Sequence, residues 1–357
     1  MTDRPDDDLP PGDTPGDTPP GARPNTARAG DDTGGDTRGD FSMPVGLAFG
    51  GGVLSRGPAR SLVGNRSNSA SERLVAYALG ACALLTVATT LSIAAILVVE
   101  SLGFFRHVSI VDFLTGTQWT GQIDGENWGI WPLLSGTFLI TAIAAVAALP
   151  LGLAAAIYVS QYASERVRRW LKPGLELLAG VPTIVYGFFA LTFVTPLLKT
   201  IIPGLQVYNA LSAGLVVGVM IIPLVASLSE DALRAVPRAL SEGGYALGAT
   251  KIEVVTRILV PGALSGIVAS FILAISRAIG ETMIVVIAAG AQPRLTLNPL
   301  DSVQTMTAYI AQVTQGDAAQ GTVEFQSLFA VGLALFLLTL GMNLIANAVI
   351  RRFKESY

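Results

Sequence analysis

The residues best suited to chemistry lie in one short polar stretch inside an otherwise apolar segment. Arg277 and Glu281 are four positions apart, so a continuous helix would place both side chains on one face. Ser276 and Thr282 add hydroxyl groups beside them. A guanidinium binds oxyanion oxygens in a bidentate manner, and Glu281 could neutralise it while no anion is present. We therefore predict a site where an arriving oxyanion replaces Glu281 as the partner of Arg277. The alternative is an ion pair that only fixes helix packing.

The elements that carry these residues are expected to cross a membrane. Of the 357 residues, 51% are hydrophobic and 14% charged, whereas a soluble domain carries about 25% charged residues. Six apolar stretches approach the ~20 residues that a spanning helix needs. They lie at Leu74–Val99, Leu133–Val159, Leu175–Leu198, Ala210–Leu228, Ala263–Ala289 and Leu328–Ile350. The predicted fold class is therefore an all-α membrane protein with six transmembrane helices.

Arg277 falls near the middle of the fifth stretch. An arginine at that depth costs about 2.5–3.5 kcal/mol on insertion scales, so it should face the bundle interior or a water-filled path.

The distribution of lysine and arginine predicts the orientation. With the N-terminus inside, the inner segments from Arg56 onward hold fifteen of these residues and the outer segments hold only Arg106, Lys199 and Arg294. Positive charge accumulates on the cytoplasmic side, so both termini are expected to be cytoplasmic. The outer loops then fall at about 100–131 and 290–326. Trp119, Trp128 and Trp131 are predicted to form an interfacial aromatic belt.

The first 70 residues differ from the rest of the chain. Residues 1–40 hold ten Asp and four Arg, and Gly, Pro and Thr dominate the surrounding sequence. Such a segment cannot bury enough apolar area to offset its ordering entropy. We predict a disordered acidic cytoplasmic tail over 1–70 and a membrane domain over 71–357.

Few residues are available for metal or nucleotide chemistry. The chain has one cysteine, Cys82, and one histidine, His107, which excludes an internal disulfide and a multi-histidine metal site. A P-loop needs a lysine after glycine, and no lysine in this sequence follows one. We expect no enzymatic activity, no cofactor and no metal in this chain.

The longest inner loop has helical signals. Pro237 suits a first helical position, Gly248 suits a helix end, and Thr250 with Glu253 forms a capping box. The loop is predicted to hold two short helices that meet at Gly248–Ala249 and to dock a partner.

This loop resembles the EAA loop of permeases from ATP-binding-cassette (ABC) importers. Glu242-Gly243-Gly244, three residues, Gly248, nine residues and Ile258-Leu259-Val260-Pro261 match the family spacing of Glu-Ala-Ala, Gly and Ile-x-Leu-Pro. The chain departs from the pattern at Gly243, Gly244 and Val260. The resemblance implies a coupling loop over 230–262 that seats in a groove of a separate ATPase subunit. The residues it assigns to coupling are Ser241, Glu242, Gly243, Gly244, Gly248, Thr250 and Pro261.

Two further blocks resemble the phosphate permeases of that family. Arg277-Ala-Ile-Gly-Glu-Thr282 is similar to their Arg-Ala-x-Gly-Glu-Thr, and the following Met283 resembles the PstC-type subunit more than the PstA-type. The run from Leu178 to Gly187 is similar to their Leu-Ala-Gly-x-Pro-Ser-x-Val-Tyr-Gly block. By this resemblance Thr183 and Tyr186 would line the path, beyond a kink at Pro182.

The resemblance implies a type I, MetI-like permease of the cell (inner or plasma) membrane that imports phosphate by alternating access. Its implied partners are a second permease subunit, two ATP-binding subunits, an extracytoplasmic phosphate-binding protein and membrane lipid, but no nucleic acid. ATP would be bound by the partner. The alternatives are a permease for sulfate or molybdate, a secondary transporter in which Arg277 and Glu281 relay protons or ions, and a membrane anchor. The secondary transporter predicts inverted repeats, which the sequence does not show convincingly.

Overall fold

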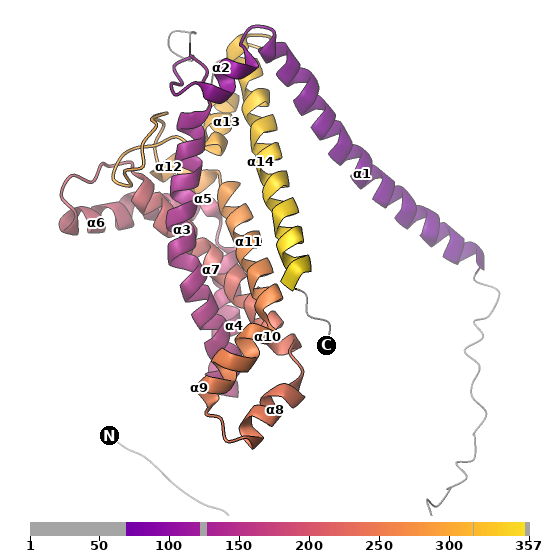
Figure 1. Ribbon diagram of the computed structural model, residues 1–357. Helices are drawn as coiled ribbons and strands as arrows, with labels where there is room; N and C mark the ends of the chain where they lie inside the picture. Colours follow the sequence, from indigo (N-terminus) through magenta and orange to yellow (C-terminus); the bar gives the residue numbers. More distant parts are fainter. Residues whose placement is uncertain (1–68, 122–126, 317, 354–357) are drawn as a thin grey trace, which may run out of the picture. The chain divides into compact units, whose positions relative to one another are not determined.

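The computed structural model describes residues 69–121, 127–316 and 318–353, and these residues are mainly helical (Figure 1). Most of the predicted tail over 1–70 lies outside them. The α-helices are α1 (Ser69–Phe105), α2 (Ile110–Thr115), α3 (Trp131–Ile157), α4 (Glu165–Gly180), α5 (Thr183–Phe189), α6 (Thr195–Ile201), α7 (Ala210–Ala235), α8 (Arg238–Ala246), α9 (Lys251–Val254), α10 (Val260–Gly262), α11 (Leu264–Ile279), α12 (Met283–Ala288), α13 (Met306–Gln315) and α14 (Val323–Phe353). π-Helical turns join some of them at Tyr158–Tyr162, Ala190–Val194 and Val255–Leu259.

The predicted all-α membrane class is confirmed, with five segments able to cross a membrane, or six if one bent pair counts as a single span. Within the part of the chain that the structure describes, five helical segments are long and apolar enough to cross a membrane: Ser71–Phe105, Trp131–Tyr162, Thr183–Ile201, Ala210–Ala235 and Val323–Ala348. The sixth is the pair Lys251–Gly262 and Leu264–Ile279, whose two parts are inclined by 70°. We call residues 238–262, from α8 to α10, the elbow, and α11 is the apolar segment that follows it.

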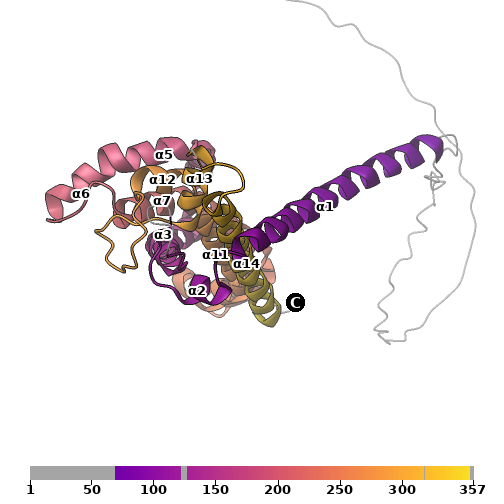
Figure 2. The same cartoon turned by 90° about the horizontal axis from the view of Figure 1, so that it is seen from above.

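The centre of the bundle is the contact between α3 and α7 (Figures 1 and 2). Glycines allow the two helices to approach closely. A Cβ atom at Gly152 would lie 2.7 Å from Val225, and one at Gly214 would lie 2.7 Å from Ile143. Lipid tails are as apolar as the helices, so helices in a membrane associate through close packing of this kind. The α3–α7 pair therefore supplies the rigid frame for the site.

Helix α1 contacts α14, packs Phe104 at its C-terminal end against Phe113 and Trp128, and over the rest of its length leaves the bundle (Figure 2). None of the residues in its most apolar stretch is buried within the chain. Such a surface requires an apolar environment, which a bilayer supplies.

Aromatic side chains form a cluster at the end of the bundle where α2 and α13 lie. The Trp119 ring lies 5.3 Å from that of Trp128 and 4.9 Å from that of Tyr309, both edge to face. Burial raises the pKa of the Tyr309 phenol. Trp119 and Trp128 are only 2% and 5% exposed, so the predicted belt is wrong for these two residues. They pack inward because their own segment folds back over α13, whereas Trp131 is 47% exposed.

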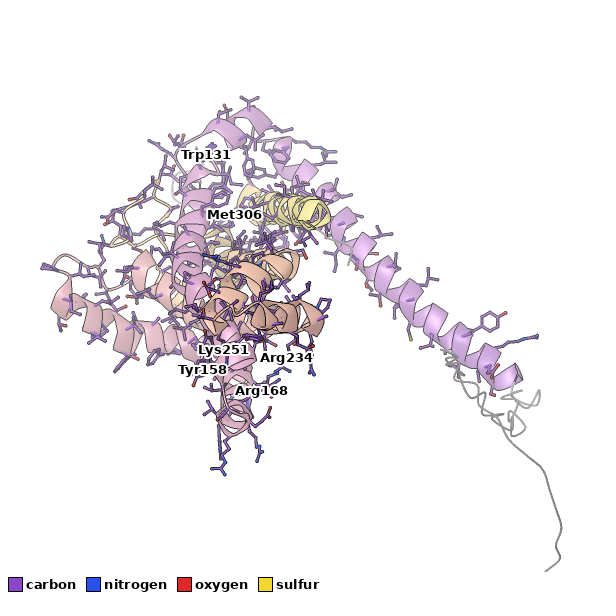
Figure 3. The ribbon with its side chains drawn as sticks, turned by 60° about the horizontal axis from the view of Figure 1, so that its bottom comes forward. Trp131, Tyr158, Arg168, Arg234, Lys251 and Met306 are labelled. Carbon is purple, nitrogen blue, oxygen red and sulfur yellow. The ribbon has the colours of Figure 1, made fainter. Side chains whose placement is uncertain are left out.

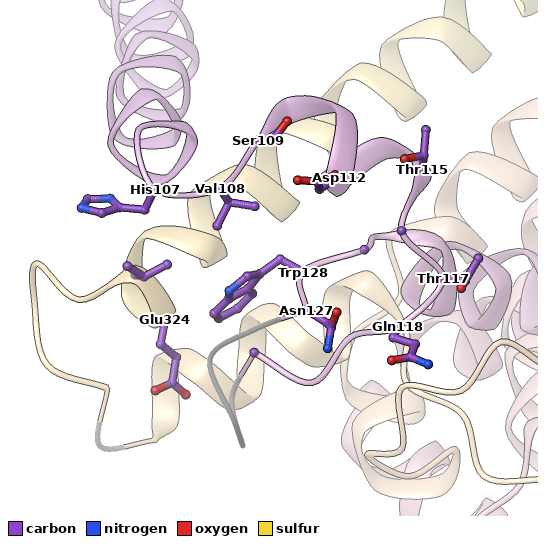
Figure 4. Close-up of a pocket in the computed structure, with 14 residues that line it drawn as sticks. His107, Val108, Ser109, Asp112, Thr115, Thr117, Gln118, Asn127, Trp128 and Glu324 are labelled. Carbon is purple, nitrogen blue, oxygen red and sulfur yellow. The ribbon is translucent and has the colours of Figure 1, made fainter.

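A polar cavity of about 660 Å³ opens beside this aromatic cluster (Figure 4). His107, Asp112, Gln118 and Asn127 line it, together with Glu324 from α14. It lies far along the chain from Arg277 and belongs to the end of the bundle that carries α2.

Two of the predicted continuous segments are interrupted. In the third, α4 ends at Gly180 and α5 begins at Thr183, with Val181 extended at φ −66° and ψ 130°. The ring of Pro182 disfavours a helical conformation at the preceding residue, which explains why the chain breaks rather than kinks. In the fifth, α11 ends at Ile279 and α12 begins at Met283.

Candidate functional site

Arg277 lies in the last turn of α11 and lines a cavity of about 290 Å³. Arg277 is an exposed residue of the chain, and that it faces a path rather than the lipid stays a prediction. Helices α4 and α7 provide the rest of the wall. Lys172, Glu176, Ser227 and Glu230 are its polar residues, and the apolar ones are Leu175, Ala179, Met220, Pro223 and Leu224. Apolar walls lower the local dielectric constant and so strengthen any contact between Arg277 and an anion.

The predicted ion pair between Arg277 and Glu281 is wrong. Helix α11 has ended before Glu281, so the four-residue spacing no longer places the two side chains on one face. The Glu281 carboxylate instead accepts hydrogen bonds from the backbone N–H groups of Met283 (3.1 Å) and Ile284 (3.3 Å). It is 6% exposed and satisfies the first free N–H groups of α12. Glu281 is thus a structural cap for α12 in this conformation.

The two hydroxyl residues beside the pair are placed differently. The Ser276 hydroxyl oxygen is buried without a hydrogen-bond partner. The Thr282 hydroxyl donates to the carbonyl oxygen of Gly280 at 3.3 Å, across the break between α11 and α12. Of the two, Ser276 keeps its hydrogen-bonding capacity free for a ligand.

Tyr186 spans the break in the third segment. Its hydroxyl donates to the carbonyl oxygen of Leu178 at 2.7 Å, and its ring is 6% exposed. This bond joins α4 to α5 across Pro182. Thr183 is the first residue of α5 and is half-buried. Contact of Thr183 or Tyr186 with a substrate stays a prediction.

A second charged group, which the sequence did not reveal, lies next to the Arg277 cavity. Glu230 of α7 is 4% exposed, and its carboxylate forms ion pairs with three cations. The nitrogen-to-oxygen distances are 2.7 Å to Arg234, 3.0 Å to Lys172 and 3.3 Å to Arg168. The four-residue spacing of Glu230 and Arg234 was a local signal. Its link to Arg168 and Lys172 depends on how α4 packs against α7, which no local pattern specifies.

The inner loop forms the predicted elbow of two short helices. Helix α8 ends before Gly248, whose φ of +83° suits glycine, and α9 begins after Thr250. The N–H and hydroxyl of Thr250 donate to the Glu253 carboxylate at 2.9 and 2.8 Å and lower the pKa of Glu253. Pro237 caps α8 rather than beginning it. Leu247, at the turn, is 90% exposed.

The two glycines at 243 and 244 occupy different environments. A Cβ atom at Gly244 would lie 2.6 Å from Ile258 and 3.1 Å from Val254, so the helix packs closely against the other arm of the elbow there. A Cβ atom at Gly243 would meet nothing within 4 Å. Only Gly244 is therefore required by packing within the chain. The remaining predicted coupling residues are near the surface: Ser241 is half-buried, and Glu242, Gly248, Thr250 and Pro261 are exposed.

A bundle of apolar helices long enough to cross a membrane, an arginine that lines a cavity between them and an exposed helical elbow are the features of a membrane transport subunit, a permease. The chain belongs to the family described as the binding-protein-dependent transport system inner membrane component, which matches residues 148–355. It is a multi-pass membrane protein of that family.

Curated relatives cover most of the chain. It is 33% identical over 294 residues to the "Probable ABC transporter permease protein YqgH" of Bacillus subtilis (strain 168), covering 78% of this chain and 95% of the relative. It is 32% identical over 259 residues to "Phosphate transport system permease protein PstC" of Mesorhizobium japonicum, covering 67% and 78%. For "Phosphate transport system permease protein PstC 1" of Mycobacterium tuberculosis, the identity is 33% over 296 residues, covering 72% and 87%.

Solved structures agree on the fold. A bacterial alginate ABC transporter, in complex with an alginate pentasaccharide-bound periplasmic protein, superposes with a TM-score of 0.59 at 16% identity. The match covers 81% of this chain and 99% of that chain, so the predicted permease fold is confirmed over nearly the whole of the compared subunit.

Proposed function

We propose that this chain is the transmembrane permease subunit of an ATP-driven importer of inorganic phosphate. The observation that supports it most directly is Arg277, which lines a cavity together with residues of α4 and α7. Guanidinium groups suit the planar, bidentate recognition of phosphate oxygens. Relatives that carry the name phosphate transport system permease protein PstC support the choice of anion.

The other subunits would complete the transporter. A second permease subunit would supply the other half of the path, and two ATP-binding subunits would grip the elbow at 241–261. An extracytoplasmic phosphate-binding protein would deliver the anion to the outer loops. ATP-driven closure of the ATPases would tilt the helices attached to the elbow and open the cavity outward by alternating access. The termini would lie in the cytoplasm, on the side of the elbow.

Uptake of radiolabelled phosphate by cells carrying the assembled transporter tests this proposal. Arg277→Gln should lower uptake about tenfold to a hundredfold, because it removes a charge-assisted hydrogen bond of about 1.5–3 kcal/mol. Arg277→Lys keeps the charge and loses the planar group that makes two parallel hydrogen bonds, so it should retain part of the activity. Copurification of the partner subunits with each variant shows that the complex still assembles.

Sulfate and molybdate serve as competitors in the same assay. Unlabelled phosphate should suppress uptake and the other two anions should not. Normal phosphate uptake by an assembled Arg277→Gln transporter would contradict the role of Arg277, and preferential competition by sulfate would contradict the choice of anion.

A further inference from the structure

The Glu230 cluster carries more positive charge than its carboxylate can offset. Glu230 is nearly fully buried in α7, and Arg168 and Lys172 of α4 reach it together with Arg234. Figure 3 labels Arg168 and Arg234 at the end of the bundle that carries the elbow. One carboxylate balances one of the three cations, and two positive charges remain.

These cations connect two neighbouring cavities. Lys172 and Glu230 line the cavity of Arg277. Arg168 and Arg234 line a second cavity of about 370 Å³, where they are joined by Arg238, Ser241 and Glu242 of the elbow. A series of cations thus runs from Arg277 through Lys172 to the elbow, and Glu230 is the shared counter-ion in its middle.

The charge in and around the first cavity matches a doubly charged anion. Arg277, Lys172, Glu176 and Glu230 line it and balance one another, and Arg168 and Arg234 of the second cavity add two cations through their ion pairs with Glu230. Four positive and two negative groups leave an excess of two positive charges, which a phosphate dianion would neutralise. Because Glu230 is shared among three cations, it offsets the charge of Lys172 only in part, and Lys172 can still attract an anion.

Lys172 is the cation best placed to exchange partners. Its side chain is 38% exposed and its ammonium carries three rotatable donors on a flexible stem. The Lys172 ammonium lies 3.0 Å from the Glu230 carboxylate and lines the same cavity as Arg277, so an anion held by Arg277 would compete with Glu230 for it.

We propose that Lys172 and Arg277 form an anion subsite in this cavity and that Glu230 holds Lys172 while the subsite is empty. The ligand is a tetrahedral oxyanion bearing two negative charges. It passes from Arg277 to Lys172 and then to the second cavity, which the elbow lines. Glu230 thereby takes the exchangeable counter-ion role that the sequence had suggested for Glu281. This inference rests on the proposed function.

Equilibrium binding of radiolabelled phosphate tests the subsite. The assembled transporter is placed in nanodiscs of zwitterionic lipid without nucleotide. Lys172→Gln should weaken binding about tenfold or more, since a charged hydrogen-bond donor is lost. Lys172→Arg should restore most of the affinity. Arg169→Gln is the matched control, because it removes the same charge from an exposed position of α4 outside both cavities and should leave binding unchanged.

Glu230→Gln gives a second measurement of opposite sign. It frees Lys172 from its resident partner, so phosphate should bind more tightly than to the unmodified transporter. Unchanged binding in Lys172→Gln, or weakened binding in an assembled Glu230→Gln transporter, would overturn the subsite.

A phospholipid headgroup carries the same phosphate chemistry, and a change of lipid separates the two sources. If the headgroup is the occupant, nanodiscs with phosphatidylglycerol should weaken phosphate binding in a manner that disappears in Lys172→Gln. Equal binding in both lipids identifies free phosphate as the occupant.

Failure of the proposed function would give a different result from failure of the subsite. A transporter that takes up labelled sulfate and not phosphate contradicts the proposed substrate. The same variants are then measured with labelled sulfate, and equal sulfate binding by Lys172→Gln and Arg169→Gln would overturn the subsite alone.

Discussion

At Glu281, one break in the helical backbone changes which groups the side chain contacts. On a continuous helix it would neutralise Arg277, but Gly280 ends α11 with φ −85° and ψ 1°. The carboxylate then meets the N–H groups of Met283 and Ile284, where a negative charge stabilises the first turn of α12. The acids that share a cavity with Arg277 are Glu176 and Glu230.

This capping role predicts a graded response at position 281. Glu281→Gln keeps an acceptor oxygen for the two N–H groups, so thermal stability of the complex should change little. Glu281→Ala removes the cap and should cost about 1 kcal/mol of unfolding free energy. Melting of the purified complex measures both. A Glu281→Gln variant that is fully stable yet inactive in uptake would show that the charge serves transport.

At the scale of the helices, close packing of the elbow gives its two adjacent glycines different environments. Gly244 touches Ile258 and Val254 of the opposite arm, while Gly243 faces open space within the chain. Glycine in a helix costs about 0.5–1 kcal/mol relative to alanine, so α8 is weaker than the family pattern would make it.

Alanine at each glycine tests that contact. Gly243→Ala should strengthen α8 by about 0.5–1 kcal/mol. Gly244→Ala should gain less or lose stability, because Ile258 has to move away from the new Cβ atom. Hydrogen exchange of the α8 amides in the purified complex reports the difference directly. Equal protection in the two variants would contradict the packing of the elbow.

At the scale of the whole molecule, the exposed leucines at Leu247 and Leu297 provide a test of orientation. Leu247 lies on the elbow and is 90% exposed, and Leu297 lies between α12 and α13 and is 81% exposed. The proposed orientation places the first inside the cell and the second outside.

Cysteine labelling measures this arrangement. Cys82→Ser removes the single cysteine of the chain. In that background, a membrane-impermeant maleimide applied to intact cells should label Leu297→Cys and leave Leu247→Cys unlabelled. Permeabilised cells should show labelling of both, which controls for reactivity. Labelling of Leu247→Cys in intact cells would reverse the proposed orientation.

Local patterns were sufficient for the number of spans and for the elbow. Apolar length follows directly from bilayer thickness, and the turn at Gly248 with the Thr250–Glu253 contact depends only on neighbours in sequence. The expectation that Arg277 faces a polar path follows from its cost in lipid and stays a prediction. Helical periodicity failed at Glu281, where a break of three residues changes the face on which a side chain lies.

The partners of the charged residues required the tertiary structure. Glu230 and Lys172 are 58 positions apart, and their contact exists only because α4 lies against α7. Trp119 and Trp128 are likewise buried by a segment that folds back over α13. The hydrophobic length of a segment can be determined from that segment alone, whereas the counter-ion of a charged residue depends on which segments pack together. Helix packing decides this, and small residues such as Gly152 and Gly214 allow the helices to approach closely.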